Sequence, residues 1–372
     1  MNAGHYDVTI AGAGFAGLAC ARTAARSGLR TQVMERATWP GAPQRTTGIL
    51  VRELAERWCP PARLCRRIEG IRLYGPDLHY MDLHSPGYYF LATDTTALIN
   101  WHRRCAIEAG ARVSFGEPFR HARLDAGGLE INGGDSHTRF LVGCDGARSR
   151  VARDLGLGCN RDFLIGAEAE LAPLPQVDPS YLHVFLDGEL APGYIGWVVP
   201  GMGVIQAGLG CRLPRRPDLR RFLRRVARCF NVGHLQPLRF RGGLIPCGGQ
   251  VQPWHGDRVL LLGDAAGTVS PVTGGGIHPA VWLGELAGAA VADHLLGNGP
   301  PPAQPVAAAL PSHGAKLLLR RGMDALPVPD LLARLIFSSL PFRALAQLLF
   351  FHSRGLLSAR AWRELLTLVQ DH

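Results

Sequence analysis

Residues 6–17 of the chain read YDVTIAGAGFAG, a short β-type run that ends in glycines spaced as GxGxxG. An alanine-rich stretch over 18–27 then predicts a helix, and a second β-type run over 31–34 leads to Glu35. This order of strand, glycine turn, helix, strand and acidic residue is typical of a Rossmann βαβ unit. A glycine-rich turn in an unrelated α/β domain is the alternative, and the completeness of the pattern disfavours it.

The three glycines of this motif have different physical roles. Gly12 permits a tight turn, Gly14 lets the backbone approach a pyrophosphate, and Gly17 lets the helix pack on the strand. The N-terminus of the helix faces the phosphate charge, and Glu35 can accept hydrogen bonds from a ribose diol. The segment therefore predicts a dinucleotide-binding site.

Two later segments also run from a strand into a turn and a helix. Residues 140–153 contain Asp145 after an apolar strand, and residues 258–267 contain Asp264 after another. A triple glycine at 274–276 then opens an alanine-rich helix. An α/β sheet presents hydrogen-bonding groups to a cofactor at such strand ends, and Asp145 can in addition cap the helix that follows it.

In this order and spacing the three segments resemble the flavoprotein monooxygenase and reductase superfamily, whose members are p-hydroxybenzoate hydroxylase-like. The resemblance covers residues 1–300. It implies that FAD binds with its pyrophosphate and ribose at the first segment, its ribityl chain at Asp264, and its flavin facing the glycine-opened helix. The residues that it implies for cofactor binding are Gly12, Gly14, Phe15, Ala16, Gly17, Glu35, Arg36, Arg45, Thr46, Asp145, Asp264, Gly275, Gly276 and Ile277.

Within that superfamily the third segment is similar to the geranylgeranyl reductase family. Gly267 stands where the aromatic hydroxylases usually have a histidine. Residues 192–200 resemble the family's Tyr-x-Trp-x-Phe-Pro element, which implies that Tyr194 and Trp197 line a substrate cavity. Trp197 stands one residue further from Tyr194 than in that element, and Val199 replaces the phenylalanine. The alternative is that both aromatic rings fill core.

Two departures from the family pattern bear on the chemistry. Family reductases commonly carry a Cys-Gly pair at the flavin, whereas residues 44–49 read QRTTGI. A threonine hydroxyl cannot replace a thiol as an acid near neutral pH. The family's arginine ahead of the next helix is also missing, because residues 93–96 read TDTT. Arg45 can contact the cofactor or remain a surface arginine, and both roles stay open.

The resemblance leaves two enzyme classes open. In the first, an NAD(P)H-linked FAD enzyme reduces C=C bonds of a hydrophobic, isoprenoid or lipid-like substrate, which Gly267 and the triple glycine favour. In the second, an FAD-dependent monooxygenase hydroxylates an aromatic or other activated substrate, which the missing cysteine favours. NAD(P)H would bind transiently, since the chain has one complete dinucleotide fingerprint. A flavoprotein with structural or sensing FAD is the non-enzymatic alternative.

Individual catalytic residues are not identified at this stage. His278 can serve as an acid or base near the flavin, or have an ordinary packing role at a helix start. A halogenase is disfavoured because that group uses a lysine early in the chain, and the single lysine here is Lys316. The sequence carries no cluster of metal ligands and no signal for an oligomeric state.

The motif order predicts an α/β fold with a Rossmann-like FAD-binding domain, an inserted antiparallel-sheet substrate domain and C-terminal helices. The expected FAD-binding domain is discontinuous. Its pieces are 1–75, 93–153 and 252–300, the substrate domain comprises 76–92 and 154–251, and the C-terminal helical region is 301–372.

Composition agrees with a globular enzyme. The 372 residues are 47% hydrophobic and 19% charged, which excludes a disordered chain. The formal charge is +10, but the arginines are dispersed, so nucleic-acid binding is not expected. The near-absence of lysine is typical of a GC-rich bacterial genome. The arginines over 215–228 predict a solvated helix face, with a phosphate or anionic-lipid contact as the alternative.

The expected setting is cytoplasmic. The nine cysteines are scattered without a CxxC pair, which favours reduced thiols, and no signal peptide is expected near the first residues. The apolar stretch over 331–351 is interrupted by Arg334, Pro341 and Arg343, so it is not expected to span a bilayer. It predicts helices over a hydrophobic substrate tunnel, or else a peripheral membrane contact that supplies a lipid.

Overall fold

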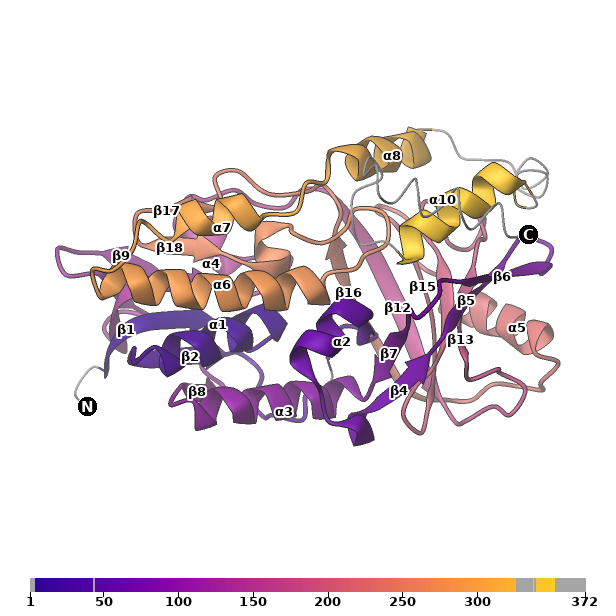
Figure 1. Cartoon of the computed structure of the whole chain (residues 1–372), viewed down its shortest axis with the longest axis horizontal. Helices are drawn as coiled ribbons and strands as arrows, with labels where there is room; N and C mark the ends of the chain where they lie inside the picture. The colour runs from indigo at the N-terminus through magenta and orange to yellow at the C-terminus, as the bar shows by residue number, and fades with distance from the viewer. Residues whose placement is uncertain (1–3, 43, 326–336, 338, 352–372) are drawn as a thin grey trace.

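The structure is a computed structural model and describes residues 4–42, 44–325, 337 and 339–351. Two halves lie side by side (Figure 1), and the chain crosses between them several times. One half is built on a largely parallel sheet and the other on a largely antiparallel sheet. The α/β fold class expected from the sequence is confirmed.

The first half is an eight-stranded sheet in which β17-β18-β11-β1-β2-β8 are neighbours, with β10 and β9 added beside β11. Its strands are β1 (Gly4–Ala11), β2 (Thr31–Glu35), β8 (Arg112–Phe115), β9 (Ala122–Leu124), β10 (Leu129–Ile131), β11 (Ser136–Gly143), β17 (His255–Gly256) and β18 (Val259–Leu261). The pairs from β18 through β8 are parallel. Their carboxyl ends therefore meet at one edge, where an open α/β sheet binds ligands.

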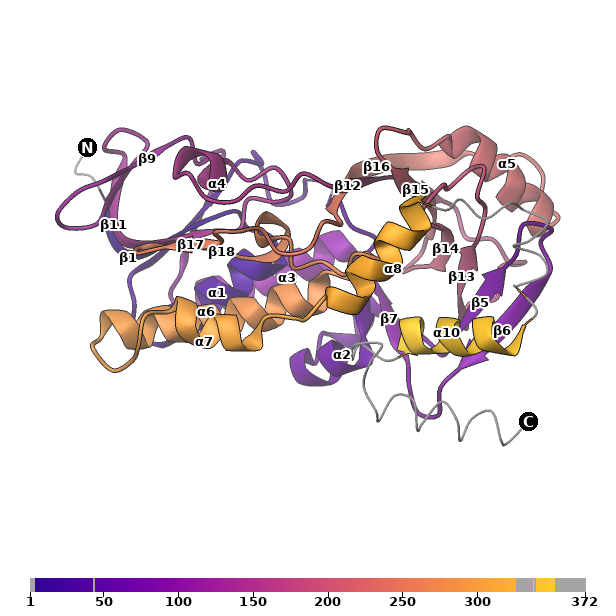
Figure 2. The same cartoon turned by 90° about the horizontal axis from the view of Figure 1, so that it is seen from above.

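Helices cover both faces of this sheet, as Figure 2 shows. On one face lie α1 (Phe15–Arg26), α3 (Thr95–Glu108) and α6 (Ile277–Leu295), and on the other lies the short α4 (Arg150–Asp154). The carboxyl-terminal halves of β1 and β11 are accordingly buried at every position, because both of their faces are covered there. Beyond α6 the chain forms α7 (Ala303–Ala309) and α8 (Gly314–Ala325), and η2 (Gly263–Ala266) follows β18.

The second half is a seven-stranded sheet in the order β16-β12-β15-β14-β13-β5-β6. Its strands are β5 (Gly70–Tyr74), β6 (Tyr80–His84), β12 (Phe163–Leu171), β13 (Tyr181–Phe185), β14 (Gly196–Pro200), β15 (Ile205–Arg212) and β16 (Pro237–Pro246). All pairs are antiparallel except β13 with β5. Between the halves lie the three-stranded sheet of β3 (Ile49–Val51), β7 (Phe90–Thr93) and β4 (Cys65–Ile68), helix α2 (Arg52–Trp58) and the single turn η1 (Ala62–Leu64).

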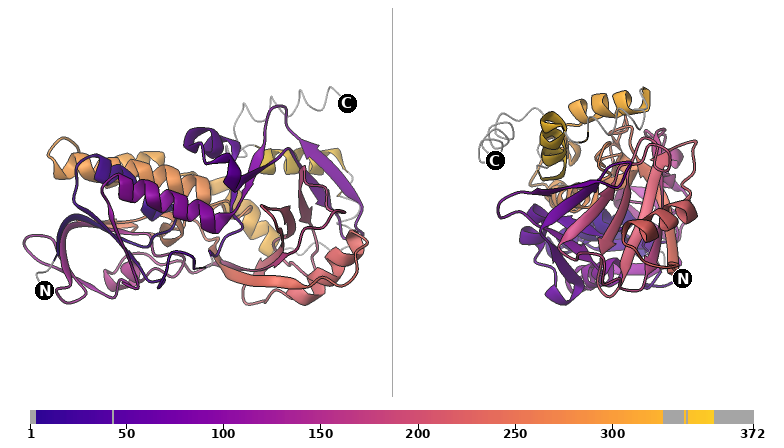
Figure 3. Two further views of the ribbon diagram at one scale, coloured as in Figure 1. Left: turned by 90° about the horizontal axis from the view of Figure 1, so that it is seen from below. Right: turned by 90° about the vertical axis from the view of Figure 1, so that its right-hand side faces the viewer.

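The seven-stranded sheet has two unlike faces. Side chains such as Ala169, Val198 and Leu209 pack against α5 (Leu219–Cys229) on one face. Val199 and Trp197, which alternate with Val198, belong instead to the face covered by α10 (Leu340–Phe351). Figure 3 shows the two helices on opposite sides of the strands.

Two sequence expectations look different once the strands are placed. The first boundary of the FAD-binding domain was expected at residue 75, yet β5 pairs with β13 and β6, so the seven-stranded sheet already begins at Gly70.

The apolar tail expected over 331–351 lies partly outside the described residues. Within them, Pro341 stands in the first turn of α10, where the N–H that proline lacks would have no acceptor within the helix. Among the described helices, none is long and apolar enough to cross a bilayer.

The contact between α1 and α6 depends on glycines. A Cβ at Gly284 would lie 2.5 Å from the carbonyl oxygen of Ala16, and a Cβ at Gly288 would lie 2.5 Å from that of Cys20. A step of four residues along α6 matches a step of four residues along α1, so the two helices run in the same direction, and their backbones are in contact at these glycines. Side chains at these positions would separate them.

We expect Gly288→Ala to lower the free energy of unfolding of the apoprotein by about 1–3 kcal/mol, because the added methyl overpacks the helix contact. Gly322→Ala is the matched control: Gly322 is in α8 and its Cβ would meet no described atom within 4 Å, so stability should stay equal or rise by about 0.5–1 kcal/mol. Urea unfolding followed by circular dichroism measures both. Equal effects of the two substitutions would contradict the packing argument.

Candidate active site

The first glycine turn is fixed by backbone contacts. Gly12 has φ +106°, and a Cβ there would lie 2.3 Å from the carbonyl oxygen of Cys144. A Cβ at Gly17 would lie 2.0 Å from the carbonyl oxygen of Gly12 and 3.2 Å from Cγ2 of Ile10. Gly12 and Gly17 are thus required by the turn and by the packing of α1 on β1, as their spacing predicted.

Gly14 is different because its environment is open. It is the N-cap of α1 with φ −80°, and an added Cβ would meet no described atom within 4 Å. The helix begins without a side-chain cap, so the first N–H groups, from Phe15 and Ala16 onward, have no acceptor within the helix. An open backbone cradle with free N–H donors at a helix N-terminus suits a pyrophosphate.

Glu35 is held beside this cradle by two backbone hydrogen bonds. Its Oε2 accepts from the N–H of Ala13 at 2.8 Å, and its Oε1 accepts from the N–H of Ala37 at 2.8 Å. Both oxygens keep a free lone pair, so the carboxylate can also accept from ribose hydroxyls. The neighbouring Arg36 is exposed, and no ion pair of its guanidinium is recorded in the described part of the chain.

Asp264 lies at the second helix N-terminus of the site. It stands in η2, and Gly276, the N-cap of α6, would place a Cβ 3.7 Å from its Oδ1. Its carboxylate has no hydrogen-bond donor among the described residues, and burial raises its pKa to about 6. A half-buried carboxylate without a donor fits a ligand that brings hydroxyl donors, as a ribityl chain does.

The start of α6 is also open. Gly276 provides no side-chain cap, Gly275 is exposed, and Ile277 begins the helix. His278 follows in the first turn, half-buried, and burial lowers its pKa, which the Glu53 carboxylate opposes. It is therefore a neutral imidazole at pH 7, able to accept or donate one proton.

The side chain of Asp145 mainly caps α4, the helix that follows it. Its Oδ2 accepts from the N–H groups of Arg150 at 2.6 Å and Val151 at 3.0 Å, and the Ser149 hydroxyl accepts from Ala152. The other oxygen, Oδ1, is buried and has no hydrogen-bond partner in the part of the chain that the structure describes. The capping role foreseen for Asp145 is confirmed, and its predicted contact with the cofactor remains a prediction.

The loop over 44–48 lies where the family cysteine was expected. Thr93 donates from Oγ1 to the carbonyl of Gly48 at 2.7 Å, and Thr95 donates to the carbonyl of Thr47 at 3.2 Å. The threonines that replace the family's arginine thus hold this loop. Arg45 is exposed, with its Cβ 3.4 Å from where a Cβ of Gly243 would lie, against β16 of the other half.

The two aromatic residues predicted to line the cavity stand at the junction of the halves. The Tyr194 hydroxyl donates to the carbonyl oxygen of Thr273 at 2.9 Å, directly before the triple glycine. Burial raises the pKa of Tyr194, so its hydroxyl stays protonated. The Trp197 ring lies over Gly208, where a Cβ would come within 2.7 Å of it. The structure thus brings the seven-stranded sheet into contact with the loop that opens α6.

A buried carboxylate that the motifs did not indicate completes this junction. Glu168 is 3% exposed and accepts hydrogen bonds from Thr47 Oγ1 and Trp197 Nε1, both at 2.7 Å, with its charge balanced by Arg241. Two glutamates at alternating positions of β12 face two arginines at alternating positions of β16. That pattern of opposite charges with period two was the signal available in the sequence.

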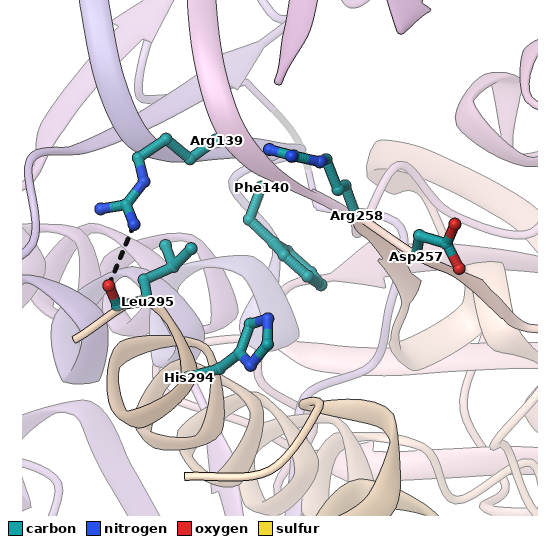
Figure 4. Close-up of a pocket in the computed structure, with 6 residues that line it drawn as sticks. All are labelled: Arg139, Phe140, Asp257, Arg258, His294 and Leu295. Atoms are coloured by element: carbon teal, nitrogen blue, oxygen red, sulfur yellow. Dashed lines mark hydrogen bonds between the residues drawn. The ribbon is translucent and has the colours of Figure 1, made fainter. Parts of the chain in front are cut away.

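A separate hollow of about 420 Å³ lies far from these residues. It is lined by Arg139, Phe140, Asp257, Arg258, His294 and Leu295, and Figure 4 shows Arg139 donating to the carbonyl of Leu295. His294 and Leu295 end α6, whose 19 residues span about 27 Å, so the hollow is at the opposite end of the helix from the triple glycine. None of its lining residues belongs to the site, and the described residues contain no group of metal ligands.

The glycine cradle, the ribose-facing carboxylate and the unsatisfied Asp264 fit FAD in donor and acceptor chemistry. Such a combination is expected of the cofactor site of an FAD-dependent oxidoreductase. The sequence pattern of a family described as FAD dependent oxidoreductase matches residues 7–133.

Relatives specify the family further. The digeranylgeranylglycerophospholipid reductase 2 of Methanopyrus kandleri is 30% identical, with 78% of each chain covered. The geranylgeranyl diphosphate reductase of Rhodobacter capsulatus is 29% identical over 79% of this chain and 77% of its own. A geranylgeranyl bacteriochlorophyll reductase-like structure from Thermoplasma acidophilum has the same fold, with a TM-score of 0.79, 22% identity and 99% of both chains covered. The chain belongs to the geranylgeranyl reductase family.

Gly14→Ala should weaken FAD binding by about tenfold or more without destabilising the apoprotein, because the methyl group occupies the open cradle and meets no protein atom. Gly17→Ala is the contrasting variant and should lose about 1–3 kcal/mol of stability through its clash with Gly12. FAD fluorescence titration and thermal unfolding of the apoprotein separate the two. If Gly14→Ala kept wild-type affinity, the cradle assignment would be wrong.

Asp264→Asn should also lower FAD affinity by about tenfold at pH 8, since a hydroxyl bond to a carboxylate becomes a bond to a neutral amide. The difference should narrow below pH 6, where the wild-type acid is itself protonated in the apoprotein. Titrations with FAD at pH 5 and pH 8 measure this. Asp125→Asn, in a surface turn, is the control and should leave the affinity unchanged.

The same substitution should stabilise the apoprotein at neutral pH. Because the pKa of Asp264 rises from 3.8 to about 6 on folding, the folded chain holds a proton that the unfolded chain has lost, and stability falls as pH rises between these values. Asp264→Asn removes the titrating carboxyl group and with it this loss of stability at higher pH. Melting temperatures of apoprotein from pH 4 to pH 8 should fall less steeply in the variant; parallel curves would show that Asp264 is not desolvated.

Proposed function

We propose that this enzyme reduces C=C bonds in a hydrophobic, isoprenoid or lipid-like substrate, with NAD(P)H as the transient electron donor. The observation that carries the proposal is the hydrogen bond from Tyr194 to Thr273, which joins the substrate sheet to the loop opening α6. That bond sets a wall of aromatic side chains next to the place where the family resemblance puts the flavin. Bound FAD supplies the hydride chemistry of the reaction.

The protein's own part is to bind and orient a long apolar chain. Trp197 belongs to an apolar cluster that continues along the sheet through Val199, Val184 and Leu73 to Phe351 of α10. This face is the one on which the site lies, whereas α5 covers the other face. The residues of this cluster are themselves buried, and Tyr194 and Trp197 at its end beside the flavin site are only half-buried. We propose that a polyisoprenoid chain contacts these two rings, which suit it better than they suit a small polar substrate.

The choice of substrate class is supported by the relatives named above, which are reductases of geranylgeranyl groups. The sequence has one complete dinucleotide fingerprint, so the proposed NAD(P)H donor would bind transiently, without a Rossmann unit of its own. The proposed location is cytoplasmic, with peripheral access to lipid. The near-absence of lysine supports a bacterial source.

Monooxygenation is the second candidate function, and one observation favours it. The loop over 44–48 presents Thr46 and Thr47 where family reductases commonly have a cysteine. The Thr47 hydroxyl is occupied with Glu168 and cannot act as a thiol-like acid. The proton that alkene reduction requires at the second carbon must then come from another group or from water.

Anaerobic stopped-flow absorbance of the reduced holoenzyme separates the two functions. Mixing with a geranylgeranyl lipid should reoxidise the flavin, and mass spectrometry should find a product with two hydrogens added for each reduced bond. The fully saturated phytanyl lipid is the matched control and should leave the flavin reduced. Reoxidation that requires oxygen, together with a product that has gained an oxygen atom, would replace the proposal with monooxygenation.

A further inference from the structure

The most highly satisfied buried charge of the junction is the carboxylate of Glu168. On β12 it is the register partner of Arg241 on β16, whose Nε donates to Oε1 at 2.5 Å and whose Nη2 contacts the same oxygen. The side chains of both residues are almost fully buried, at 4% and 9% exposure. A buried carboxylate is stable only when it is paired and fully hydrogen-bonded, and this one is.

The second oxygen of Glu168 serves two other elements. Oε2 accepts from Thr47 Oγ1, in the loop ahead of β3, and from Trp197 Nε1, on β14. One carboxylate therefore fixes the loop, the indole and the edge strand β16 relative to each other. These elements are far apart in sequence, and the loop comes from the part of the chain that contains the glycine turn.

Gln206 on β15 adds a second tie between the same partners. In the amide orientation that satisfies both of its ends, it donates to the carbonyl oxygen of Thr47 at 3.0 Å and accepts from Arg241 Nη2 at 2.9 Å. Gln206 is 3% exposed. Thr47 is therefore held through its hydroxyl and its carbonyl from the substrate sheet, while Thr95 holds that carbonyl from the other side.

We infer that Glu168 is a positioning residue that sets the loop over 44–48 and the Trp197 ring as one unit at the substrate side of the cofactor. The inference rests on the proposed function insofar as this unit faces the substrate. The seven-stranded sheet, which also carries Trp197, thereby fixes the position of this loop. Glu168 thereby acts through Thr47 and Trp197, without contact with reacting atoms.

The chemistry of the loop agrees with this role. Thr47 directs its hydroxyl to the carboxylate, so the position cannot present a reactive group to the cofactor and is free to serve as an anchor. Gly48 follows with φ +78° and no room for a Cβ, which would lie 2.0 Å from Thr95 Oγ1. The backbone conformation of the loop is thus sterically restricted at the residue that follows Thr47.

Limited trypsin digestion tests the anchor without any cofactor. Arg45 is exposed within the loop, and cleavage after it creates a fragment that begins at Thr46. In apoprotein, Thr47→Val should raise the rate of this cleavage by about tenfold or more, since a hydrogen bond to a charged group is lost. Thr47→Ser keeps the hydroxyl and should restore the wild-type rate.

Glu168→Gln should produce the same increase, and Glu189→Gln is its matched control. Glu189 pairs with Arg221 on α5, on the other face of the sheet, so its loss should leave cleavage after Arg45 unchanged. Thr47→Val leaves the buried ion pair of Glu168 and Arg241 intact. Its cleavage rate therefore tests the inference even if the Glu168→Gln variant does not fold. Wild-type cleavage rates in a folded Thr47→Val variant would overturn the inference.

A second readout uses the holoenzyme. In Thr47→Val the visible absorbance of bound FAD should shift, and the KM for the geranylgeranyl lipid should rise more than kcat falls, because the substrate wall is displaced. Thr47→Ser should reverse both effects. If the wild-type enzyme did not reduce the lipid, the proposed function would be wrong, but the trypsin and absorbance results would still test the role of Glu168. An unshifted FAD spectrum together with a wild-type KM in Thr47→Val would reject the positioning role of Glu168.

Discussion

The close contact between α1 and α6 is the constraint on which the rest of the site depends. Gly284 and Gly288 let the two helices run in the same direction with backbone against backbone. Their N-termini consequently point toward the same edge of the sheet, each with uncapped N–H groups. Two parallel helix dipoles repel weakly, and an anionic cofactor at their common end offsets that cost. The packing of the helices thus prepares the site for negative charge.

Three carboxylates follow strands at this edge and a fourth lies at the junction of the halves, and their partners separate their roles. Glu35 is held by backbone N–H groups and keeps lone pairs for a ligand, while Asp145 caps α4. The carboxylate of Asp264 has no donor within the described ranges and a raised pKa, so it is the one that a bound ligand would stabilise most. Glu168 is fully paired and therefore serves the architecture. The same functional group supports binding, capping or positioning according to what the fold places next to it.

Much of the fold was predictable because it follows from local rules. The βαβ unit, the acidic residue at its end and the strand-to-turn aspartates were all predicted from spacing and glycine placement. The motif order predicted the antiparallel insert, and the family resemblance led to FAD. The strand boundaries in the βαβ unit were close: a β-type run over 31–34 was expected and β2 spans Thr31–Glu35. The position of β5 was missed, because its parallel pairing with β13 joins segments more than a hundred residues apart.

The sequence by itself determined where a dinucleotide can bind, because a GxGxxG turn between a strand and a helix has one backbone solution that leaves Gly14 open and Gly17 packed. Only the tertiary structure decided what meets that cofactor site. Tyr194 reaches Thr273, and Glu168 gathers Thr47 and Trp197, through contacts between strands and loops remote in the chain. Hydrogen bonds over such separations depend on sheet register and sheet face, and no local pattern specifies them.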